Sequence, residues 1–579
     1  GNTIRGNRFL NCSTYGLIFR RAGANLIDNS FVECGDVGVY FLSGLRSVVE
    51  NNTISGGSVG FLMESCRNIT FRNNRLNGSG FRIIGYTRDH WDMIEIDRTN
   101  QVNTLPVDYV KNSQGFDIEG GTNQLILFNC SNVTVRDLDK DNIGPHLAYC
   151  SNLEINGCSS DHNPLGMHLF ECTDVVIENV EINNNTEAGI LMEESARVEI
   201  LDSVITGNGD SDIKSSDTMG ITMYGNLLGP RGLHLDDDPD ISSSHNIGSN
   251  NTVSGLPLIY GVGIRDREIG GDLGQIIIVD GERIRFGDMA LNGPCRGLHL
   301  ISCKDTLIDN ITLKDSNHEG IRLVECENIM IDSSWISGCE NYGMESIRSS
   351  HLTVEDTEFK HNGVGLRTGG IMVVIDNSTI TDNLGFGLIL DRGEDCRIRN
   401  NTIRGNGGTG GYVDGSTIRI QGNLFEENGE INLHLNGDTI KVENNTFRNS
   451  PTNLKMTCFK TTVSVNLIEN ASSTNSELIN CRDCEISYND IKGCKDTGLF
   501  LDYSSRGNTI HQNNFLFNGI NSLAEGKGNF FHFYVEGNYW SDYERLHVPP
   551  AQRNGSVWDI PYEIGGYNGS IDPFPLTNR

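Results

Sequence analysis

The sequence predicts an all-β protein folded as a right-handed parallel β-helix, a solenoid with about 22 residues in each coil. Three observations predict this fold. Short Val, Ile and Leu runs alternate with Asn, Asp, Gly and Ser clusters, a glycine-led strand recurs every 22 or 23 residues, and Cys and His recur at fixed places in the repeat. A chain of 579 residues exceeds one compact core but suits an array of repeats.

Each repeat opens with a glycine-led strand, as in "GPHLAYCSNLEI" (144–155), "GMHLFECTDVVI" (166–177) and "GLHLISCKDTLI" (297–308). A turn and further short strands follow, so one repeat holds about three strands and must stack on its neighbours to bury its apolar side. Left-handed β-helices are expected to show hexapeptide repeats, which this sequence lacks. We expect the glycines to serve corners that need permissive backbone angles. They are Gly16, Gly38, Gly60, Gly144, Gly166, Gly189, Gly297, Gly320, Gly343, Gly365 and Gly387.

Alternation along the first strand of each repeat separates inward from outward side chains. The second residue after the glycine should point outward. We expect His146 and His168 there as solvent-facing residues, about 4.8 Å apart at the backbone. A metal or substrate site is the alternative, but no third ligand accompanies the pair. The outward residues are Ile18, Tyr40, Leu62, His146, His168, Leu191, His234, His299, Arg322, Glu345, Arg367 and Ile389.

A longer duplication overlies the short repeat. Pro106 aligns with Pro257 and Gln124 with Gln275, both at an offset of 151 positions. Each half is expected to leave the coil stack in an excursion that re-enters at "QLILF" or "QIIIV", either as a lateral contact device or as a decorated loop. The expected segments are coils at 1–80, an excursion at 81–121, coils at 122–239, an excursion at 240–272, coils at 273–530 and a cap at 531–579.

The formal charge of −31 argues against nucleic acid or an anionic membrane as partner, because both require a basic surface. Bridging cations or neutral glycans fit better. No stretch approaches 18 consecutive apolar residues, so no membrane span is expected, and the chain starts in mid-pattern, as at a processed or trimmed end. Fifteen N-x-S/T sequons suggest an exported, glycosylated surface, although an Asn-rich composition produces many by chance. Examples are Asn11, Asn68, Asn77, Asn132, Asn310 and Asn377.

The "NNTI…GN" coils, the "NTVSGLP" excursion and the C-terminal "EGNYWSDY" (536–543) and "WDIPYEIGGYNGSIDPFPL" (558–576) resemble a known family. It comprises right-handed β-helix proteins of the NosD-like, carbohydrate-binding-and-sugar-hydrolysis type, especially the large archaeal surface versions. The resemblance covers nearly the whole chain and implies an aromatic segment that covers the last coil. A hydrophobic lid there would close an open sheet edge. The residues suited to it are Trp540, Tyr543, Trp558, Tyr562 and Phe574.

Two sets of charged residues are candidate sites. Arg322, Glu345 and Arg367 occupy outward positions on three successive coils, where acid–base groups could flank a sugar bond; alternatively, one Glu between two Arg neutralises stacked charges. The second set is the acidic run at 236–240, which could bind calcium through its hard carboxylate oxygens. Alternatively the run forms a solvated turn, since it lacks the ligand spacing of a dedicated calcium loop. "ERLHVPPAQRNGSV" replaces the Asp/Gly-rich stretch expected of the family, which argues against calcium in the cap. The calcium candidates are Asp236, Asp237, Asp238 and Asp240.

The cysteines recur in register, which favours disulfides between stacked coils. The alternative is a ladder of buried free thiols. Cys481 and Cys484 in "CRDC" could bond locally or to a neighbouring chain, and zinc is less favoured because no second close pair completes four ligands. The other disulfide candidates are Cys66, Cys130, Cys150 and Cys172 at one position, Cys303 and Cys326 at its equivalent in the second half, and Cys12 and Cys34 at another.

Two classes of function follow from these features. The first is a non-catalytic extracellular protein that self-associates into a homopolymer, forming an archaeal surface layer, sheath or filament. The alternative is a secreted polysaccharide-binding or polysaccharide-cleaving protein; β-helices serve both uses. Copper delivery follows only from the NosD label, and the 11 Met residues form no clustered thioether site. No cofactor other than calcium is suggested.

Overall fold

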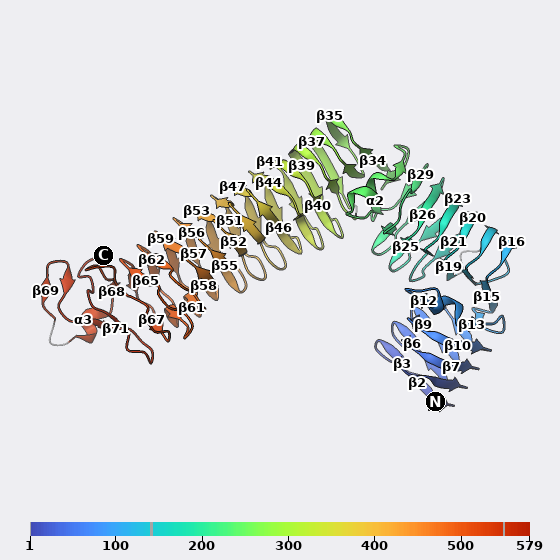
Figure 1. The fold of residues 1–579 in the computed structure, drawn as a ribbon, viewed down its shortest axis with the longest axis horizontal. Coiled ribbons are helices and arrows are strands. Elements are labelled where there is room, and N and C mark those ends of the chain that lie inside the picture. The colour runs from blue at the N-terminus through green and yellow to red at the C-terminus, as the bar shows by residue number, and fades with distance from the viewer. Residues whose placement is uncertain (1, 139–142, 294, 548–550) are drawn as a thin grey trace. The chain divides into compact units, whose positions relative to one another are not determined.

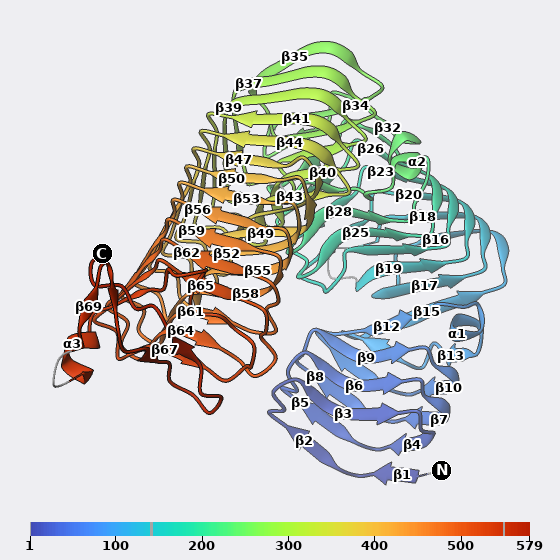
Figure 2. The same ribbon diagram turned by 60° about the vertical axis from the view of Figure 1, so that its left-hand side comes forward.

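The structure is a computed structural model that describes residues 2–138, 143–293, 295–547 and 551–579. Its backbone divides into two compact units. The first comprises Gly1–Tyr260 and Leu273–Ile276, and the second comprises Gly261–Asp272 and Ile277–Arg579. Within each unit, successive coils of short strands stack on one another (Figures 1 and 2).

Coils in the first unit are built from three strands. One coil holds β6 (Val37–Leu42), β7 (Leu45–Glu50) and β8 (Thr53–Ser55), and the next holds β9 (Val59–Glu64), β10 (Arg67–Arg72) and β11 (Arg75–Asn77). Each strand pairs in parallel with its equivalent in the next coil. This pairing confirms the predicted solenoid of parallel strands.

One sheet of the second unit carries the candidate site described below, and its strands pair in parallel from coil to coil. The opposite wall is a second parallel sheet that runs from β35 (Arg265–Asp272) to β68 (Tyr539–Trp540). In the second unit, the sheet that carries the candidate site includes β38 (Leu298–Ile301), β40 (Glu319–Val324), β43 (Tyr342–Ile347), β46 (Val364–Ile371), β49 (Leu388–Glu394), β52 (Gly411–Ser416), β55 (Ile431–Asp438), β58 (Thr452–Phe459), β61 (Thr474–Leu478), β64 (Thr497–Leu501) and β67 (Ile520–Ala524).

The recurrent glycines lie one above another. A Cβ added to Gly166 would lie 2.5 Å from the carbonyl oxygen of Gly189, and one added to Gly343 would lie 2.5 Å from that of Gly365. Neither Gly166 nor Gly343 has a positive φ. Glycine is therefore required because the next coil approaches too closely for a side chain, and not because the corner needs unusual backbone angles.

Buried asparagines form ladders along the solenoid. The Asn445 Oδ1 accepts hydrogen bonds from the backbone N and the Nδ2 of Asn423, both at 2.9 Å. The Asn445 N–H donates in turn to Asn466 Oδ1, and its Nδ2 donates to the Ile420 carbonyl. Each amide thus satisfies backbone groups that the turns leave unpaired. This ladder comprises Asn401, Asn423, Asn445, Asn466, Asn489, Asn513 and Asn538.

The aromatic lid at the C-terminal end is confirmed. Trp540 stacks on Phe515 of the last coil at 4.4 Å and on Tyr562 at 4.1 Å between ring centroids. Its indole Nε1 donates to the buried Asp572 carboxylate at 2.9 Å. Tyr543, Trp558 and Tyr562 are also buried, whereas Phe574 is only half-buried.

Residues 81–121 differ from the expected excursion. The strands β12 (Phe81–Ile84), β13 (Ile94–Ile96) and β14 (Gln101–Val102) pair in parallel with β9, β10 and β11, so they form another coil. The helix α1 (Asp89–Asp92) is inserted within that coil. The chain then reverses, because β14 pairs antiparallel with β15 (Leu105–Lys111).

The reversal is repeated in the second half of the duplication, where β33 (Thr252–Val253) pairs antiparallel with β34 (Leu256–Val262). After each reversal, a buried glutamine side chain replaces a strand neighbour. Gln124 accepts from the Phe81 N–H at 2.9 Å and donates to the Phe81 carbonyl at 2.6 Å. Gln275 makes the same two bonds to Leu233, at 2.9 and 2.7 Å.

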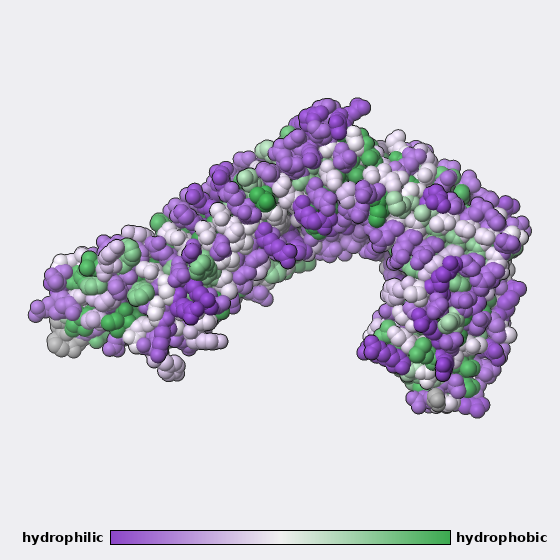
Figure 3. Space-filling model, in the orientation of Figure 1, coloured by the Kyte–Doolittle hydropathy of each residue, from purple (hydrophilic) through white to green (hydrophobic). Residues whose placement is uncertain are grey.

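Hydrophilic side chains dominate the molecular face shown in Figure 3, with apolar residues scattered among them. The helices α1, α2 (Pro239–Ser243) and α3 (Tyr543–Leu546) span only one turn or slightly more. In the part of the chain that the structure describes, no helix is long and apolar enough to cross a membrane.

Replacement of the ladder residue Asn445 by Ala should lower the free energy of unfolding by about 2–3 kcal/mol, because the Asn423 N–H loses its acceptor in a buried site. Urea denaturation would measure the loss. The control is Asn444→Gly at the adjacent exposed turn, where the φ of 56° suits glycine. Equal stability of Asn445→Ala and the wild type would contradict the structural role of the ladder.

Replacement of Gln124 by Leu should leave the Phe81 N–H and C=O without partners and cost about 2–5 kcal/mol. Hydrogen exchange followed by mass spectrometry should show faster exchange in the peptide that contains β12. Gln114→Leu, at an exposed position of the same segment, is the matched control. Unchanged exchange of the β12 peptide would show that the amide does not hold this strand.

Candidate functional site

A row of outward side chains crosses the sheet of the second unit that contains β40 to β61. Strand register places one member on each successive coil, so Tyr412 pairs with His434 and His434 with Lys455. We call this set the outer row. It comprises Arg322, Glu345, Arg367, Ile389, Tyr412, His434, Lys455 and Glu477.

The three residues singled out by sequence do meet. Glu345 forms ion pairs with Arg322 and with Arg367, the latter at 3.1 Å. Arg322 and Glu345 are only 7% and 5% exposed, whereas Arg367 is half-buried. Burial lowers the pKa of Arg367, but hydrogen bonds to Asp391 and Tyr342 outweigh it and raise that pKa. Only the Arg367 end of this trio is therefore open to a ligand.

A groove of about 570 Å³ adjoins Arg367. Asp391 and Asp414 line it, and the Arg367 guanidinium donates to Asp391 at 2.9 Å while Asn436 Nδ2 donates to Asp414 at 2.5 Å. Register shifts in β46 and β49 show that the strands bulge there. A Cβ on Gly415, with φ of 147°, would lie 2.0 Å from the Gly393 carbonyl oxygen. Gly369 and Gly370 of the bulge line the groove, and bulges occur often beside ligand sites.

Tyr412 and His434 form the aromatic part of the outer row, with ring centroids 5.3 Å apart and planes at 85°. Burial raises the pKa of Tyr412, and Asp414 and Asp391 raise it further. Burial lowers the pKa of His434, and Lys455 adds to that effect. At neutral pH the phenol is therefore protonated, and the imidazole is neutral and can accept a proton.

Tyr412, His434, Lys455 and Glu477 were not predicted from the sequence. The prediction relied on a glycine two residues before each outward residue, but the coils of His434, Lys455 and Glu477 have Asn432, Asn453 and Asn475 at that position. A search for one residue between two apolar residues, as in Leu433–His434–Leu435, would have found the outward position without the glycine.

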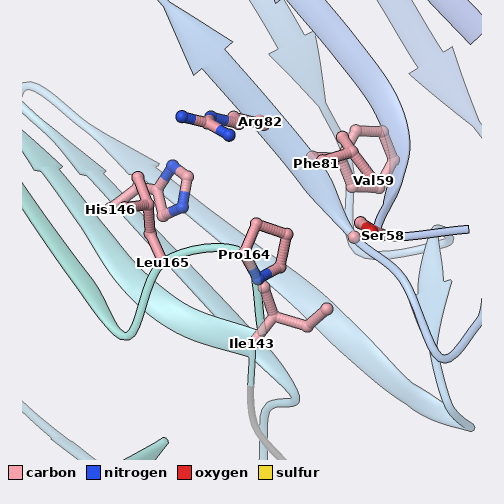
Figure 4. Close-up of a pocket in the computed structure, with 9 residues that line it drawn as sticks. Ser58, Val59, Phe81, Arg82, Ile143, His146, Pro164 and Leu165 are labelled. Carbon is pink, nitrogen blue, oxygen red and sulfur yellow. The ribbon is translucent and has the colours of Figure 1, made fainter. Parts of the chain in front are cut away.

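His146 and His168 are not solvent-facing as expected, because they are only 3% and 6% exposed. Their rings meet edge to face at 5.7 Å, and His168 Nε2 lies 2.7 Å from Glu193. Burial holds the pKa of His146 well below its usual value, with contributions from His168 and Arg82. Figure 4 shows the Arg82 side chain beside the His146 imidazole at a small cavity.

Arg82 is itself engaged, since its guanidinium forms a two-pronged ion pair with Glu187, with one bond at 2.8 Å. The cavity beside it has room for about one water molecule. The His146 Nδ1 has no hydrogen-bond partner among the described residues. This cluster joins β12 to the coils that follow and leaves no space for a sugar.

The acidic run at 236–240 serves the local fold. Asp238 is the N-cap of α2, and its Oδ1 accepts from the N–H groups of Asp240 and Ile241 at 2.9 and 3.2 Å. Burial, with a contribution from Asp217, raises the pKa of Asp236 to about 6. Calcium binding by Asp236, Asp237, Asp238 and Asp240 stays a prediction.

All sixteen cysteines, each of them a described residue, are free thiols in the structure, and disulfides between stacked coils stay a prediction. Their position is shared with hydroxyl residues, since the Cys172 N–H donates to Ser195 Oγ at 3.0 Å and the Ser195 N–H to Thr218 Oγ1 at 3.3 Å. The shared role is to accept a backbone hydrogen bond from the preceding coil, which a thiol fulfils without pairing. The residues whose pairing stays a prediction are Cys12, Cys34, Cys66, Cys130, Cys150, Cys172, Cys303, Cys326, Cys481 and Cys484.

Cys481 and Cys484 belong to two different ladders. The Cys481 N–H donates to Ser505 Oγ and the Cys484 N–H to Asn508 Oδ1, both at 3.0 Å. The hydrogen bond with Cys484, together with burial, raises the pKa of Cys481. The same hydrogen bond lowers the pKa of Cys484. The six sequon examples named above are all exposed, and their glycosylation stays a prediction.

The free energy of unfolding should fall as pH drops below about 6.5, in part because the unfolded chain binds a proton that native His146 excludes. His146→Leu should flatten this dependence between about pH 7.5 and 5.5. Urea unfolding at both pH values would test it, with His162→Asn at an exposed turn as control. Equal pH dependence in wild type and His146→Leu would rule out this linkage.

Several solved structures are similar to parts of this chain at low identity. The Dettilon tailspike protein is 11% identical over 52% of this chain, which spans 62% of the tailspike's own length, at a TM-score of 0.32. The A-module of the Azotobacter vinelandii mannuronan C-5 epimerase AlgE6 is 12% identical, with 62% of this chain and 88% of that one covered, at a TM-score of 0.28. The periplasmic alginate epimerase AlgG is 8% identical, with 76% and 77% covered, at a TM-score of 0.19.

A comparison with curated proteins finds no match. Two family models do match the sequence. The model described as "Periplasmic copper-binding protein (NosD)" matches residues 456–545. The model described as "Right handed beta helix region" matches residues 1–132, 110–228 and 296–447, which together exceed half of the chain. The chain, with its stacked parallel coils, therefore belongs to the right-handed β-helix family.

Proposed function

We propose that the chain is a polysaccharide-binding protein of an extracellular or periplasmic compartment, and that it holds a glycan along the outer row from Arg367 to Glu477. The observation that carries the proposal is the groove beside Arg367, on a sheet where strand register places half-buried polar and aromatic side chains on successive coils. Binding by this row is the alternative function that the sequence suggested. The row does not bear on self-association into a homopolymer, which stays a prediction.

The chemistry of the row suits an elongated, hydroxyl-rich ligand. Arg367 and Lys455 offer donors, Asp391 and Asp414 offer acceptors, and the Tyr412 ring offers an apolar face for sugar C–H groups. Each coil from Tyr412 to Glu477 adds one polar or aromatic side chain at a spacing of about 4.8 Å. A polymer with a regular repeat can therefore meet a regular series of contacts.

Polysaccharide cleavage is a second candidate because of one specific feature. Neutral His434 lies beside protonated Tyr412, and the two are bordered by the Asp414 carboxylate and the Lys455 ammonium. A base and an acid close together on a glycan-binding face can remove one proton and deliver another. We propose that any cleavage takes place at these two residues.

Binding should be measured by affinity electrophoresis of the full chain against neutral and uronate polysaccharides. Tyr412→Ala should weaken the affinity about fivefold or more, because it removes the aromatic face, and Tyr412→Phe should retain most of it. Tyr86→Ala, at an exposed position of the first unit, is the matched control. The absence of binding to any polysaccharide, or equal binding by Tyr412→Ala, would overturn the proposal.

Cleavage is tested on the same samples by the release of reducing or unsaturated sugar ends. His434→Gln should abolish release and retain binding, because the amide preserves a polar contact but cannot take up a proton. Release that is unaffected by His434→Gln would exclude the assigned acid–base pair.

A further inference from the structure

A second cleft lies between the C-terminal cap and the last coils, within the second unit. It measures about 980 Å³, at the upper end of the range for small-molecule sites. Tyr488, Gln512 and Asn514 line it from the coils. Trp558 lines it from the hairpin of β69 (Arg553–Asn554) and β70 (Val557–Trp558). The outer row contributes no residue to this cleft.

The walls of this cap cleft are well ordered by contacts within the cap. The Trp558 N–H donates to the Pro575 carbonyl at 2.9 Å, so the final segment of the chain runs beside the hairpin. The Trp558 ring stacks on Tyr543 with centroids 5.1 Å apart. A preformed wall reduces the conformational cost of binding.

Exposed aromatic rings lie close to Tyr488, which lines the cleft. Tyr488, Phe533 and Tyr534 are 54%, 49% and 79% exposed, and we call them the aromatic strip. His511 connects them, because its ring lies 6.0 Å from Tyr488 and 5.2 Å from Phe533. The lid over the core does not need these rings, since Trp540 and Tyr562 already cover the last coil. Exposed apolar rings rimmed by polar groups indicate a binding surface.

The polar part of the cleft is rich in amides. Gln512, Asn514, Asn554 and Asn578 all contribute to its lining. Among the described residues, the side chains of Asn554 and Asn578 have no hydrogen-bond partner, so their donors and acceptors are available. Neutral amides offer both donors and acceptors, which matches the dual character of sugar hydroxyls.

The charge of the cleft selects against anionic ligands. Among the residues that line it, Glu536 and Asp559 are acidic and Arg579 is basic. The whole chain carries a formal charge of −31. A uronate or sulfated glycan would meet repulsion from both the lining and the surrounding protein.

We infer that the cap cleft is a second binding site, one that takes a neutral oligosaccharide with a sugar ring stacked on Tyr488 and its hydroxyls bonded to the surrounding amides. This inference does not depend on the outer row, because the two sites share no residue. Such a site would hold a neutral chain at the capped end of the solenoid.

The test is isothermal titration of the full chain with maltohexaose, cellohexaose, laminarihexaose and a hexauronate. At least one neutral hexasaccharide should bind, and the hexauronate should not bind at this site. Tyr488→Ala should weaken the neutral ligand about fivefold or more, and Tyr488→Phe should restore binding because it keeps the ring. Tyr503→Ala, at a residue 82% exposed and outside the cleft lining, is the control.

Titration of Tyr412→Ala separates this site from the outer row. If the neutral ligand responds to Tyr488→Ala and not to Tyr412→Ala, the cap cleft is the site whether or not the outer row binds glycans. If no neutral hexasaccharide binds, or if Tyr488→Ala binds as tightly as Tyr503→Ala, the inference is wrong. Either of these results leaves the proposal for the outer row intact.

Discussion

The rest of the structure depends on the stacked asparagine side chains. Apolar stacking along the axis, such as that of Phe425 on Phe447, is strong but does not fix register, because the hydrophobic effect has no direction. The amide of Asn445 does fix it, since its oxygen must meet the Asn423 N–H and its nitrogen the Ile420 carbonyl. A slip of one residue would leave both groups buried and unpaired, so each coil along this ladder is held in line with the next.

Fixed register turns a repeated position into an extended surface. Because one outward residue of each coil lies above its equivalent, changes at that position alone convert an inert sheet face into the series Arg367, Ile389, Tyr412, His434 and Lys455. The inward residues need not change. Function in such a fold is therefore carried by outward side chains and by local bulges, while the core stays uniform.

The features that repeat along the chain can be predicted from the sequence. The burial of a side chain cannot be predicted where it depends on residues from distant segments. The glycine column and the parallel coils follow from spacing alone, and Arg322, Glu345 and Arg367 were placed together correctly. Burial of His146 could not be foreseen, because Arg82 and Glu187 come from segments far from it in sequence. The recurrence of cysteine has an explanation besides disulfides, because Cys172 shares its ladder with Ser195 and the shared position supplies an acceptor for a backbone N–H. The cap cleft has no repeat signal at all.

Gln124 and Gln275, at equivalent places in the duplication, show how a solenoid tolerates a break in the stacking of its strands. One amide side chain has the same donor and acceptor as a peptide group, so Gln124 can present a single rung of sheet to Phe81 where no strand continues. A lineage that acquires an insertion between coils needs only one such residue at the splice to keep both flanking stacks wound. A long β-solenoid could in this way be lengthened by duplication, with one substitution at each junction supplying the missing backbone hydrogen bonds.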